Sequence, residues 1–413
     1  MDYRDPFAFP HEWLTPVDRS LVDSLRRWAD KEILAKRAEH QENPAALLQP
    51  ALRSLFEDLG LASLLWPEAD GGSGLRTPDL AMTMTAALEQ IGRADGSLAM
   101  ALADSLTLQA SVGVEPHRDE SRLQLLINIW RQSGQPALAA LILPALGQGE
   151  QATCDELFGL ASPAMLRVAG DGWRLHGQQC RPTGAGSCAG AFGVTALVES
   201  DRRVAFVLVS ASAEGVVRHE SFRQTGLEVW PNARVSFRDV VVPEASIAFF
   251  GGRRLRELLA WRDLACAAVV CGGLLNAQEI LQDWGETRVI KGKGQVFKNN
   301  PLTASLMGEV GGEIAAARTL TYNLARLLSR PELYGDAGDP TIYTAAVNTT
   351  GQACRLAMTA LNRSMELMAS AGYATEWNLE RIWRDTKTVE AGLGPSTAAR
   401  AQLARHFFAS QTT

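Results

Sequence analysis

The sequence predicts an α+β protein in which a helical segment, a strand-rich segment and a second helical segment follow one another. Apolar residues recur at helical spacing over the first 150 residues and again after Pro243. Between these parts, from about residue 160, short apolar stretches alternate with polar residues as in half-buried strands. We therefore expect three domains: a helical domain over 1–150, a β domain over 151–248 and a four-helix bundle over 249–413.

The individual elements follow from the same periodicities. The N-terminal helices are expected at 20–36, 48–59 and 80–91, with a long loop around Pro67 and its neighbouring glycines. The strands are expected at 173–176, 193–199, 204–209, 216–218 and 234–242. The bundle helices are expected at 255–283, 301–328, 343–371 and 377–389, where they would bury apolar stripes against one another.

Composition narrows the classes of function. The 413 residues are 46% apolar and 21% charged, as in ordinary globular proteins. A net charge of -6 lacks the basic excess that nucleic-acid binding needs. The start of the chain lacks the basic and apolar regions of a secretory signal, and the apolar run 264–275 is too short to cross a bilayer. We therefore expect a cytoplasmic protein that binds neither nucleic acid nor membrane.

The metal-binding residue types are scattered. The six cysteines show no Cys-x-x-Cys pair, and the six histidines are isolated from one another. This pattern predicts reduced thiols and no metal site.

Several motifs stand in a fixed order along the chain. The longest comprises 59–61, 66–68 and 71–75, followed by Glu89-x-Ile91-Gly92-Arg93-Ala94-Asp95-Gly96-Ser97. Later motifs are Val235-x-Phe237-x-Asp239-Val240-Val241-Val242-Pro243, then Arg288 with Gly292, then Gly372-Tyr373 with Glu376, Arg384, Asp385 and Lys387. In this order they resemble the acyl-CoA dehydrogenase family. The resemblance implies an N-terminal helical domain, a middle β-barrel domain, a C-terminal four-helix bundle, FAD as cofactor and an acyl-CoA thioester as substrate.

The resemblance also locates the catalytic base. In that family a flavin takes hydride from the β-carbon of an acyl thioester while a carboxylate removes the α-proton. Because this proton is only weakly acidic, the carboxylate must be desolvated and lie within about 3 Å of it. Counting eight residues beyond Arg384-Asp385 places the family's base at Leu393, which cannot accept a proton. The backbone N–H of Leu393 remains a candidate donor to the thioester carbonyl.

Two other carboxylates lie near candidate base positions in the sequence. Glu390 stands one helical turn before Leu393 and is interpreted as a solvated residue. Some family members carry the base on the first bundle helix, and counting back from Arg288 places that position at Arg262, beside Asp263. Asp263 is the candidate base because a carboxylate in an apolar helix is expected to be paired or functional. The alternative is that Asp263 complements the helix dipole.

The flavin contacts implied by the resemblance are partly retained. The family's Thr-Glu-Pro and Ala-Gly-Ser-Asp loop has no counterpart between Gln151 and Val168. The segment that lies beneath the flavin ring keeps only Thr183, a candidate donor to the flavin edge. Arg288 matches the arginine that grips the pyrophosphate of a flavin held mainly by a neighbouring subunit.

The other cofactor positions that the resemblance assigns show the same mixture. Asn299 or Asn300 stands in for a family glutamine, and Gly372 and Gly394 complete the candidate flavin contacts. Substitutions occur at three further positions, Lys291 for an aromatic residue, Glu366 for a glutamine and Ala369-Ser370 for a Gly-Gly pair.

Three functions are compatible with these residues. The first is an active FAD enzyme that oxidises an acyl-CoA with Asp263 or another base. The second is a structural or accessory subunit of a hetero-oligomeric acyl-CoA dehydrogenase, in which a second, intact chain supplies the base and most of the flavin site. As partners we expect an acyl-CoA thioester and a dehydrogenase-like chain, in a homo- or hetero-oligomer that is a dimer or tetramer. The third is a flavin monooxygenase on the same scaffold. The second is favoured because the substrate-facing groups are lost while Arg288 and the packing motifs remain.

Overall fold

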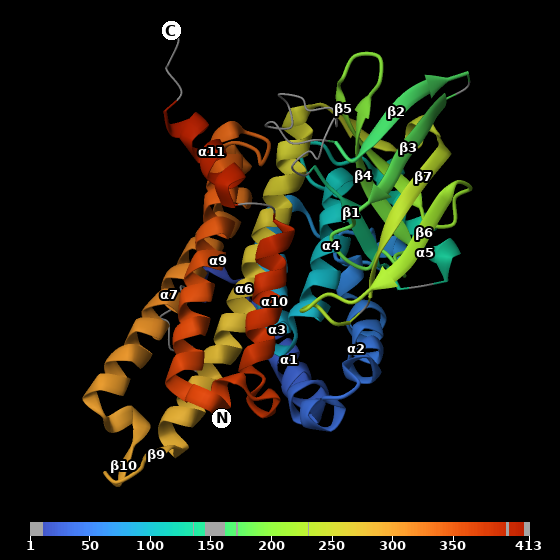
Figure 1. Ribbon diagram of the computed structural model, residues 1–413. Coiled ribbons are helices and arrows are strands. Elements are labelled where there is room, and N and C mark those ends of the chain that lie inside the picture. The colour runs from blue at the N-terminus through green and yellow to red at the C-terminus, as the bar shows by residue number, and fades with distance from the viewer. Residues whose placement is uncertain are drawn as a thin grey trace.

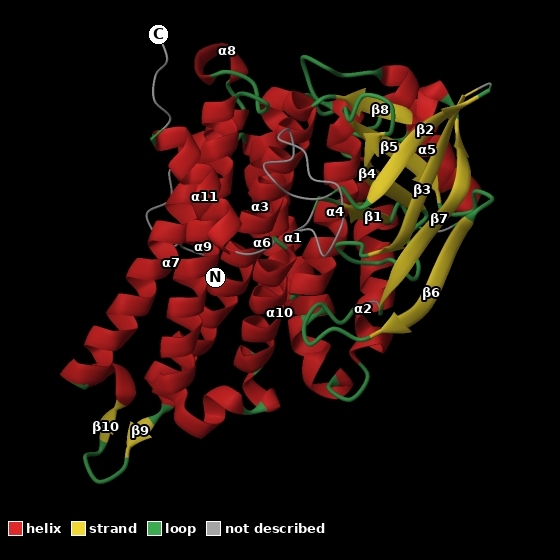
Figure 2. Cartoon of the chain, turned by 45° about the horizontal axis from the view of Figure 1, so that its top comes forward, coloured by secondary structure: helices red, strands yellow, loops and turns green. Residues whose placement is uncertain are grey.

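The computed structural model describes residues 11–134, 136–144, 162–170, 172–229, 231–393 and 396–408. Its elements follow the order helical, strand-rich, helical (Figure 1). Most helices gather on one side and the sheet lies on the other, with several of the N-terminal helices between the sheet and the C-terminal bundle (Figure 2). The α+β fold class predicted from the sequence is therefore confirmed.

Five helices form most of the N-terminal part. They are α1 (Pro16–Glu32), α2 (Pro44–Arg53), α3 (Thr77–Ala94), α4 (Gly96–Gly113) and α5 (Glu120–Ser133). The start of α1 is fixed by a capping box, in which the Asp18 backbone N–H donates to Thr15 Oγ1 at 3.1 Å. The Thr15 backbone N–H donates in return to Asp18 Oδ2 at 3.0 Å.

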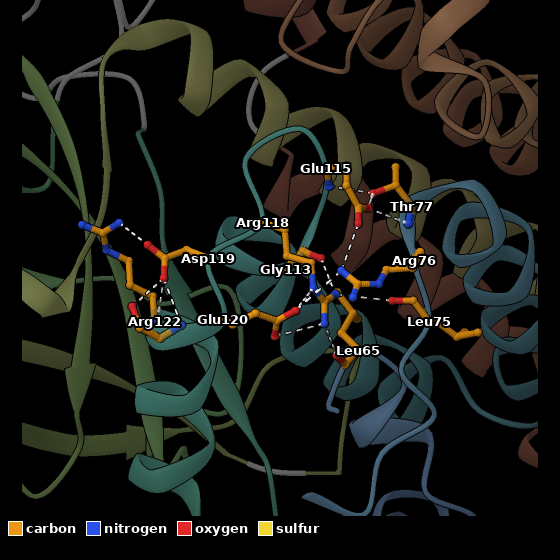
Figure 3. A network of polar contacts seen from close by, with 11 residues as sticks. Leu65, Leu75, Arg76, Thr77, Gly113, Glu115, Arg118, Asp119, Glu120 and Arg122 are labelled. Carbon is orange, nitrogen blue, oxygen red and sulfur yellow. Dashed lines mark hydrogen bonds and ion pairs between the residues drawn. The ribbon is translucent and has the colours of Figure 1, made fainter. Parts of the chain in front are cut away.

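The turn between α4 and α5 holds the long loop that precedes α3 (Figure 3). Arg118 donates from Nη1 to the Gly113 carbonyl at 2.9 Å and from Nη2 to the Leu65 carbonyl at 3.2 Å. Thr77, at the start of α3, donates from Oγ1 to Glu115 Oε2 at 2.6 Å. These bonds explain how a loop rich in glycine and proline keeps a fixed position.

Eight strands form one mixed sheet. They are β1 (Ala139–Ile142), β2 (Ala164–Ala169), β3 (Gly172–Cys180), β4 (Ala191–Val198), β5 (Val204–Ser210), β6 (Val216–Phe222), β7 (Asn232–Val242) and β8 (Ile247–Phe250). Their order is β6-β7-β3-β2-β4-β5-β8, and β1 pairs with β4. Strand β1 lies before residue 151, so the sheet begins inside the segment expected to be helical.

The expected β-barrel is wrong, because the sheet is open. Its edge strands β6 and β8 do not pair with each other among the described residues. Apolar alternation predicts strands, whereas closure depends on strand tilt and stagger, which alternation does not encode. Both faces of the central strand β4 are buried, since Ala191 and Leu197 join the helical core while Phe192 and Val194 join a second core on the other face.

The C-terminal part is a bundle built around one long helix, α6 (Gly252–Thr287). Its other helices are α7 (Pro301–Leu328), α9 (Pro340–Met368), α10 (Leu379–Gly392) and α11 (Ser396–Phe407), with the short α8 (Pro331–Tyr334) between α7 and α9. A small hairpin, β9 (Val289–Ile290) with β10 (Gln295–Val296), joins α6 to α7. Helix α6 is long and apolar enough to span a membrane, but 83% of its most apolar window is buried inside the protein, as in a core helix.

Helices α3 and α6 cross at very short range. A Cβ added at Gly272 would lie 2.3 Å from the Glu89 carbonyl oxygen, and one added at Gly92 would lie 2.7 Å from the Val269 carbonyl oxygen. On the same helix α3, the Glu89 carboxylate accepts hydrogen bonds from Arg318 Nε at 2.7 Å and from the Tyr322 hydroxyl at 2.9 Å. The N-terminal helices and the bundle therefore share one core.

Candidate functional site

The two positions at which the family resemblance places a base lie side by side in the structure. Leu393 is the C-cap residue directly after α10, and Arg262 lies on α6. Arg262 Nη2 donates a hydrogen bond of 3.2 Å to the carbonyl oxygen of Gly392, the residue before Leu393. The Arg262 side chain is 7% exposed. A leucine and a buried guanidinium thus occupy the two positions where a carboxylate is expected.

The backbone N–H of Leu393 is already engaged. It donates to the carbonyl oxygens of Val389 and Glu390, both at 3.2 Å, in the last turn of α10. A thioester carbonyl would have to replace these bonds, so the contact predicted for this N–H requires the turn to open. The neighbouring Gly394, a predicted flavin contact, lies outside the described residues.

The other two carboxylates differ from each other. Glu390 pairs with Lys387 Nζ at 2.6 Å on the surface, as expected of a solvated residue. Asp263 is half-buried, and its backbone carbonyl accepts a hydrogen bond of 2.8 Å from Thr350 Oγ1 on α9. Burial raises the pKa of Asp263 to about 7, and the neighbouring Arg262 opposes the rise. Asp263 therefore has a pKa suited to a base, but its carboxylate makes no hydrogen bond with any described residue that would aim it at the Leu393 position.

A further carboxylate escaped the sequence analysis. Asp104, in the middle of α4, is 3% exposed, and its Oδ2 accepts a hydrogen bond of 2.7 Å from Thr183 Oγ1. Burial raises the pKa of Asp104 to about 6, and Arg262 and the Thr183 hydrogen bond oppose the rise. The available signal was a lone carboxylate inside the apolar run 98–108, which is costly unless it is paired or functional.

Thr183 is consequently not free to serve a flavin edge. Its hydroxyl donates to Asp104 and accepts a hydrogen bond of 3.2 Å from the Leu141 backbone N–H. Its own backbone N–H donates to the Leu141 carbonyl oxygen at 2.8 Å. Both of its donors are used within the protein, so Thr183 offers no free donor to a flavin ring in this arrangement. The interval Gln151–Val168, where the family's wrapping loop was expected to be missing, lies largely outside the described residues.

The contact predicted for the other half of the cofactor is at the opposite end of the bundle. Arg288 is the C-cap residue directly after α6 and is exposed, with its guanidinium carbon 5.2 Å from the centre of the Trp284 ring. It has no ion-pair partner within the described part of the chain, so its guanidinium fork suits a phosphate group. The hairpin β9-β10, which follows Arg288 directly, lies at the far end of the bundle from the sheet (Figure 1). Thr183 and Arg288 of one chain therefore lie too far apart along the molecule to belong to one flavin site.

Two other predicted flavin residues have structural roles. Asn300 caps α7, because its Oδ1 accepts hydrogen bonds from the backbone N–H groups of Leu302 at 3.1 Å and Thr303 at 3.4 Å. A Cβ added at Gly372 would lie 2.7 Å from the Met365 carbonyl oxygen. Asn300 therefore stabilises the start of α7, and Gly372 allows a close approach of two backbone segments.

The motif residues around Asp95 connect α10 to the N-terminal helices and the β domain through ion pairs and hydrogen bonds. Asp95 pairs with Arg37 at 2.8 Å and also with Arg381. Asp385 Oδ1 accepts a hydrogen bond of 2.7 Å from the Leu227 backbone N–H, and burial raises the pKa of Asp385 to about 8. A cavity of about 20 Å³ lies among these groups, room for about one water. The retained motif thus positions α10, the helix that Leu393 directly follows.

This fold, with its retained motif contacts, defines the scaffold of a flavin-dependent acyl-thioester oxidoreductase. A profile described as "Acyl-CoA dehydrogenase, N-terminal domain" matches residues 15–115, and one described as "Acyl-CoA dehydrogenase, C-terminal domain" matches residues 251–408. Together the two profiles cover more than half of the chain. The chain belongs to the acyl-CoA dehydrogenase family, whose members are FAD-dependent oxidoreductases of acyl-CoA.

Individual relatives are distant. The chain is 26% identical over 408 residues to cyclohex-1-ene-1-carbonyl-CoA dehydrogenase of Syntrophus aciditrophicus strain SB, covering 95% of this chain and 90% of that protein. A glutaryl-CoA dehydrogenase of Mycobacterium smegmatis in complex with FADH2 shares the fold at a TM-score of 0.77 and 15% identity, with 96% of each chain covered. The Tcur3481-Tcur3483 steroid ACAD shares it at a TM-score of 0.74 and 18% identity, with 96% of this chain and 99% of that chain covered.

Proposed function

We propose that this chain is a subunit of a cytoplasmic acyl-CoA dehydrogenase assembly and has little or no dehydrogenase activity alone. In this proposal a second dehydrogenase-like chain supplies the catalytic carboxylate and most of the flavin site. The observation that carries the proposal is the contact between Arg262 and Gly392 beside Leu393. In this proposal a cation and an aliphatic side chain occupy the two positions at which the family resemblance places the base.

The distribution of lost and kept contacts supports the same proposal. The ring-side donors of Thr183 are used within the chain, whereas the exposed Arg288 has no ion-pair partner among the described residues. Arg288 would bind the pyrophosphate of a flavin held mainly by the partner, and the bound flavin would supply hydride acceptance there. The name of the similar Tcur3481-Tcur3483 steroid ACAD joins two proteins, which is compatible with a two-chain assembly.

An independently active enzyme is the second candidate, and one observation favours it. Burial raises the pKa of Asp263 to about 7, close to the value that suits a general base at neutral pH. Against it, Arg262, not Asp263, bonds Gly392 beside Leu393.

The test is co-expression of this chain with a dehydrogenase-like chain from the same source. The proposal predicts that the two chains co-purify, that the assembly contains flavin and oxidises butyryl-CoA, and that this chain alone does neither. A lone chain that holds flavin and oxidises butyryl-CoA at the rate of the assembly would overturn it. In that case Asp263→Asn tests the second candidate, because it keeps the shape of the side chain and removes the base.

A further inference from the structure

The loop that follows β6, residues 223–229, binds α10 at two consecutive residues. The backbone N–H of Leu227 donates a hydrogen bond of 2.7 Å to Asp385 Oδ1. Arg384 Nη1 donates to Glu228 Oε1 at 2.9 Å. The β domain is therefore joined through this loop to the helix that precedes the candidate base position.

The backbone of the loop lies directly against the backbone of α10. A Cβ added at Gly226 would lie 2.5 Å from the Arg384 carbonyl oxygen. The next residue, Leu227, has a φ of 59°, in the left-handed region that side chains other than glycine adopt at a cost. Such a conformation persists only where its surroundings hold it. The contacts with α10 therefore hold the loop in a shape that it would otherwise leave.

The acceptor of the Leu227 bond, Asp385, is a buried carboxyl that lies close to a second one. The Asp385 side chain is 7% exposed, and it lines the cavity of about 20 Å³ together with Asp95. A Cβ added at Gly96, the residue after Asp95, would lie 3.1 Å from Asp385 Oδ2. Arg37 and Arg381 both pair with Asp95, and no arginine pairs with Asp385 within the described part of the chain.

The other charged groups around the cavity are already bonded, and none of them neutralises Asp385 directly. Arg37 comes from the 3₁₀ helix Leu34–His40, and the described lining residues of α6 carry no charge. The remaining pairs are Arg93 of α3 with Asp30 and Glu279, Arg381 of α10 with Asp95, and Arg384 of α10 with Glu228 of the loop.

These surroundings favour the protonated form of Asp385. Burial and, next, the charge of Asp95 raise the pKa of Asp385 to about 8. Glu228 adds to the rise, whereas the Leu227 hydrogen bond and Arg37 oppose it. The hydrogen bond favours an ionised carboxylate, but burial and the neighbouring carboxylate outweigh it.

We propose that Asp385 in its protonated form holds the loop 223–229 against α10, and that loss of this proton releases the loop, so that the contact between the β domain and α10 depends on pH. A protonated carboxyl still accepts from the Leu227 N–H and carries no charge. An ionised one places a second negative charge beside Asp95, in a cavity with room for about one water. The inference is independent of the proposed function, because it requires neither a ligand nor a partner chain.

The direction of the pH dependence follows from the raised pKa. In the open state Asp385 is in water and has the ordinary pKa of an aspartate, about 3.9, so the closed state binds the proton more tightly. Opening therefore becomes more favourable as pH rises from about 4 to about 8, by up to about tenfold per pH unit. Above about pH 8 both states have lost the proton, and the opening equilibrium levels off.

Hydrogen–deuterium exchange of the Leu227 amide, measured by mass spectrometry on the full-length chain, tests this directly because that N–H is the donor. The protection factor is measured at pH 6, 7, 8 and 9, with the intrinsic pH dependence of exchange divided out. We expect it to fall at least about tenfold from pH 6 to pH 8 and to stay level from pH 8 to pH 9. Asp385→Asn keeps the acceptor oxygen and removes the charge, so its protection should stay near the wild-type value at pH 6 throughout.

Two further variants show what the amide reports. Gly226→Ala should lower the protection at every pH, since its Cβ would lie 2.5 Å from the Arg384 carbonyl oxygen. Asp239→Asn is the matched control, because Asp239 is an exposed carboxylate that pairs with Arg167 on the sheet at 2.9 Å. This control should keep the wild-type pH profile.

Three outcomes would overturn the inference. Equal protection at pH 6 and pH 8 in the wild type means that no proton holds the loop. Protection that falls toward acid pH means that the ionised form of Asp385 holds it. The same pH profile in Asp385→Asn as in the wild type means that another group titrates. If the circular dichroism spectrum shows that Asp385→Asn is unfolded, the wild-type profile decides alone, and a fall that continues from pH 8 to pH 9 counts against Asp385.

Discussion

Arg262 donates a hydrogen bond of 3.2 Å to the carbonyl oxygen of Gly392, and so places a buried cation beside Leu393. A carboxylate placed at Leu393 would meet this guanidinium, which favours the ionised form and lowers the basicity that proton abstraction needs. The loss of the base is therefore accompanied by a change in the electrostatics of its position.

Leu393→Glu should fail to give the lone chain dehydrogenase activity. The introduced carboxylate is expected to pair with Arg262, and the donors of Thr183 remain used within the chain. The measurement is reduction of an electron-acceptor dye with butyryl-CoA and added FAD, for Leu393→Glu and for the double variant Leu393→Glu with Arg262→Gln. Activity of the single variant approaching that of an intact family member would show that only the base was missing.

Gly272→Ala should destabilise the protein strongly. Its new Cβ would lie 2.3 Å from the Glu89 carbonyl oxygen, a backbone atom of α3 that cannot move away alone. We expect a loss of about 3 kcal/mol or more in the free energy of unfolding, as for overpacking of a rigid contact. The matched control is Gly308→Ala on α7, where nothing lies within 4 Å of the added Cβ. That change should stabilise the protein by about 0.5–1 kcal/mol through helix propensity, and urea titrations measure both. Equal effects of the two substitutions would contradict the close crossing of α3 and α6.

Asp104→Asn should stabilise the ligand-free chain at alkaline pH. Burial raises the pKa of Asp104 from 3.8 to about 6, so the folded state binds this proton more tightly than the unfolded state does. The contribution of Asp104 to stability therefore falls as pH rises between these values and stays unfavourable above them. The variant lacks this penalty, which amounts to at most about 3 kcal/mol.

Thermal unfolding at several pH values measures that effect. The advantage of Asp104→Asn over the wild type should be largest near pH 8 and should shrink as pH falls toward about 4. Asp239→Asn, an exposed Asp-to-Asn change, should show no such dependence. An advantage that grows toward acid pH would mean that the Asp104 carboxylate is stabilised in its ionised form by the fold.

Arg288→Ala should lower the flavin content of the co-purified assembly, because it removes a guanidinium that would bind the pyrophosphate of the flavin in the partner's site. The free energy of unfolding of the lone chain should change by no more than about 0.5 kcal/mol, because the Arg288 side chain is exposed. Arg288→Lys should restore only part of the flavin, since an ammonium lacks the bidentate fork. Flavin per chain, from the visible absorbance, gives the readout, with Arg167→Ala on the sheet as the control. Full flavin in Arg288→Ala would remove the proposed contact across the subunit boundary.

Periodicity predicted most helices of this fold because they bury one face in a common core. The helix expected at 301–328 has these bounds in α7, and strands were found at all five predicted places. Closure of the sheet was predicted wrongly, since the edge strands β6 and β8 remain apart among the described residues. Closure is a property of stagger between strands, which one strand's alternation does not reveal.

The candidate site was predictable in part. Counting between motifs located Leu393 and Arg262 separately, and the structure brings Arg262 to the residue before Leu393. Asp104 was missed because its importance depends on Thr183, 79 positions later in the chain, which the fold brings against α4. Sequence spacing also did not reveal that Asn300 caps α7 or that Gly372 packs closely against Met365; their cofactor roles stay predictions. Spacing along a chain identifies aligned positions, but it does not reveal which polar groups the fold pairs.

Exchange of the α-proton tests the absence of a base most directly. Butyryl-CoA carrying deuterium at the α-carbon is incubated with the purified lone chain and FAD in ordinary water, and mass spectrometry follows the loss of deuterium. With only Leu393 and Arg262 at the two base positions, the rate should equal that of buffer without protein. Exchange well above that rate, abolished by Asp263→Asn or by Asp104→Asn, would show that a carboxylate of this chain reaches the α-carbon and would contradict the account.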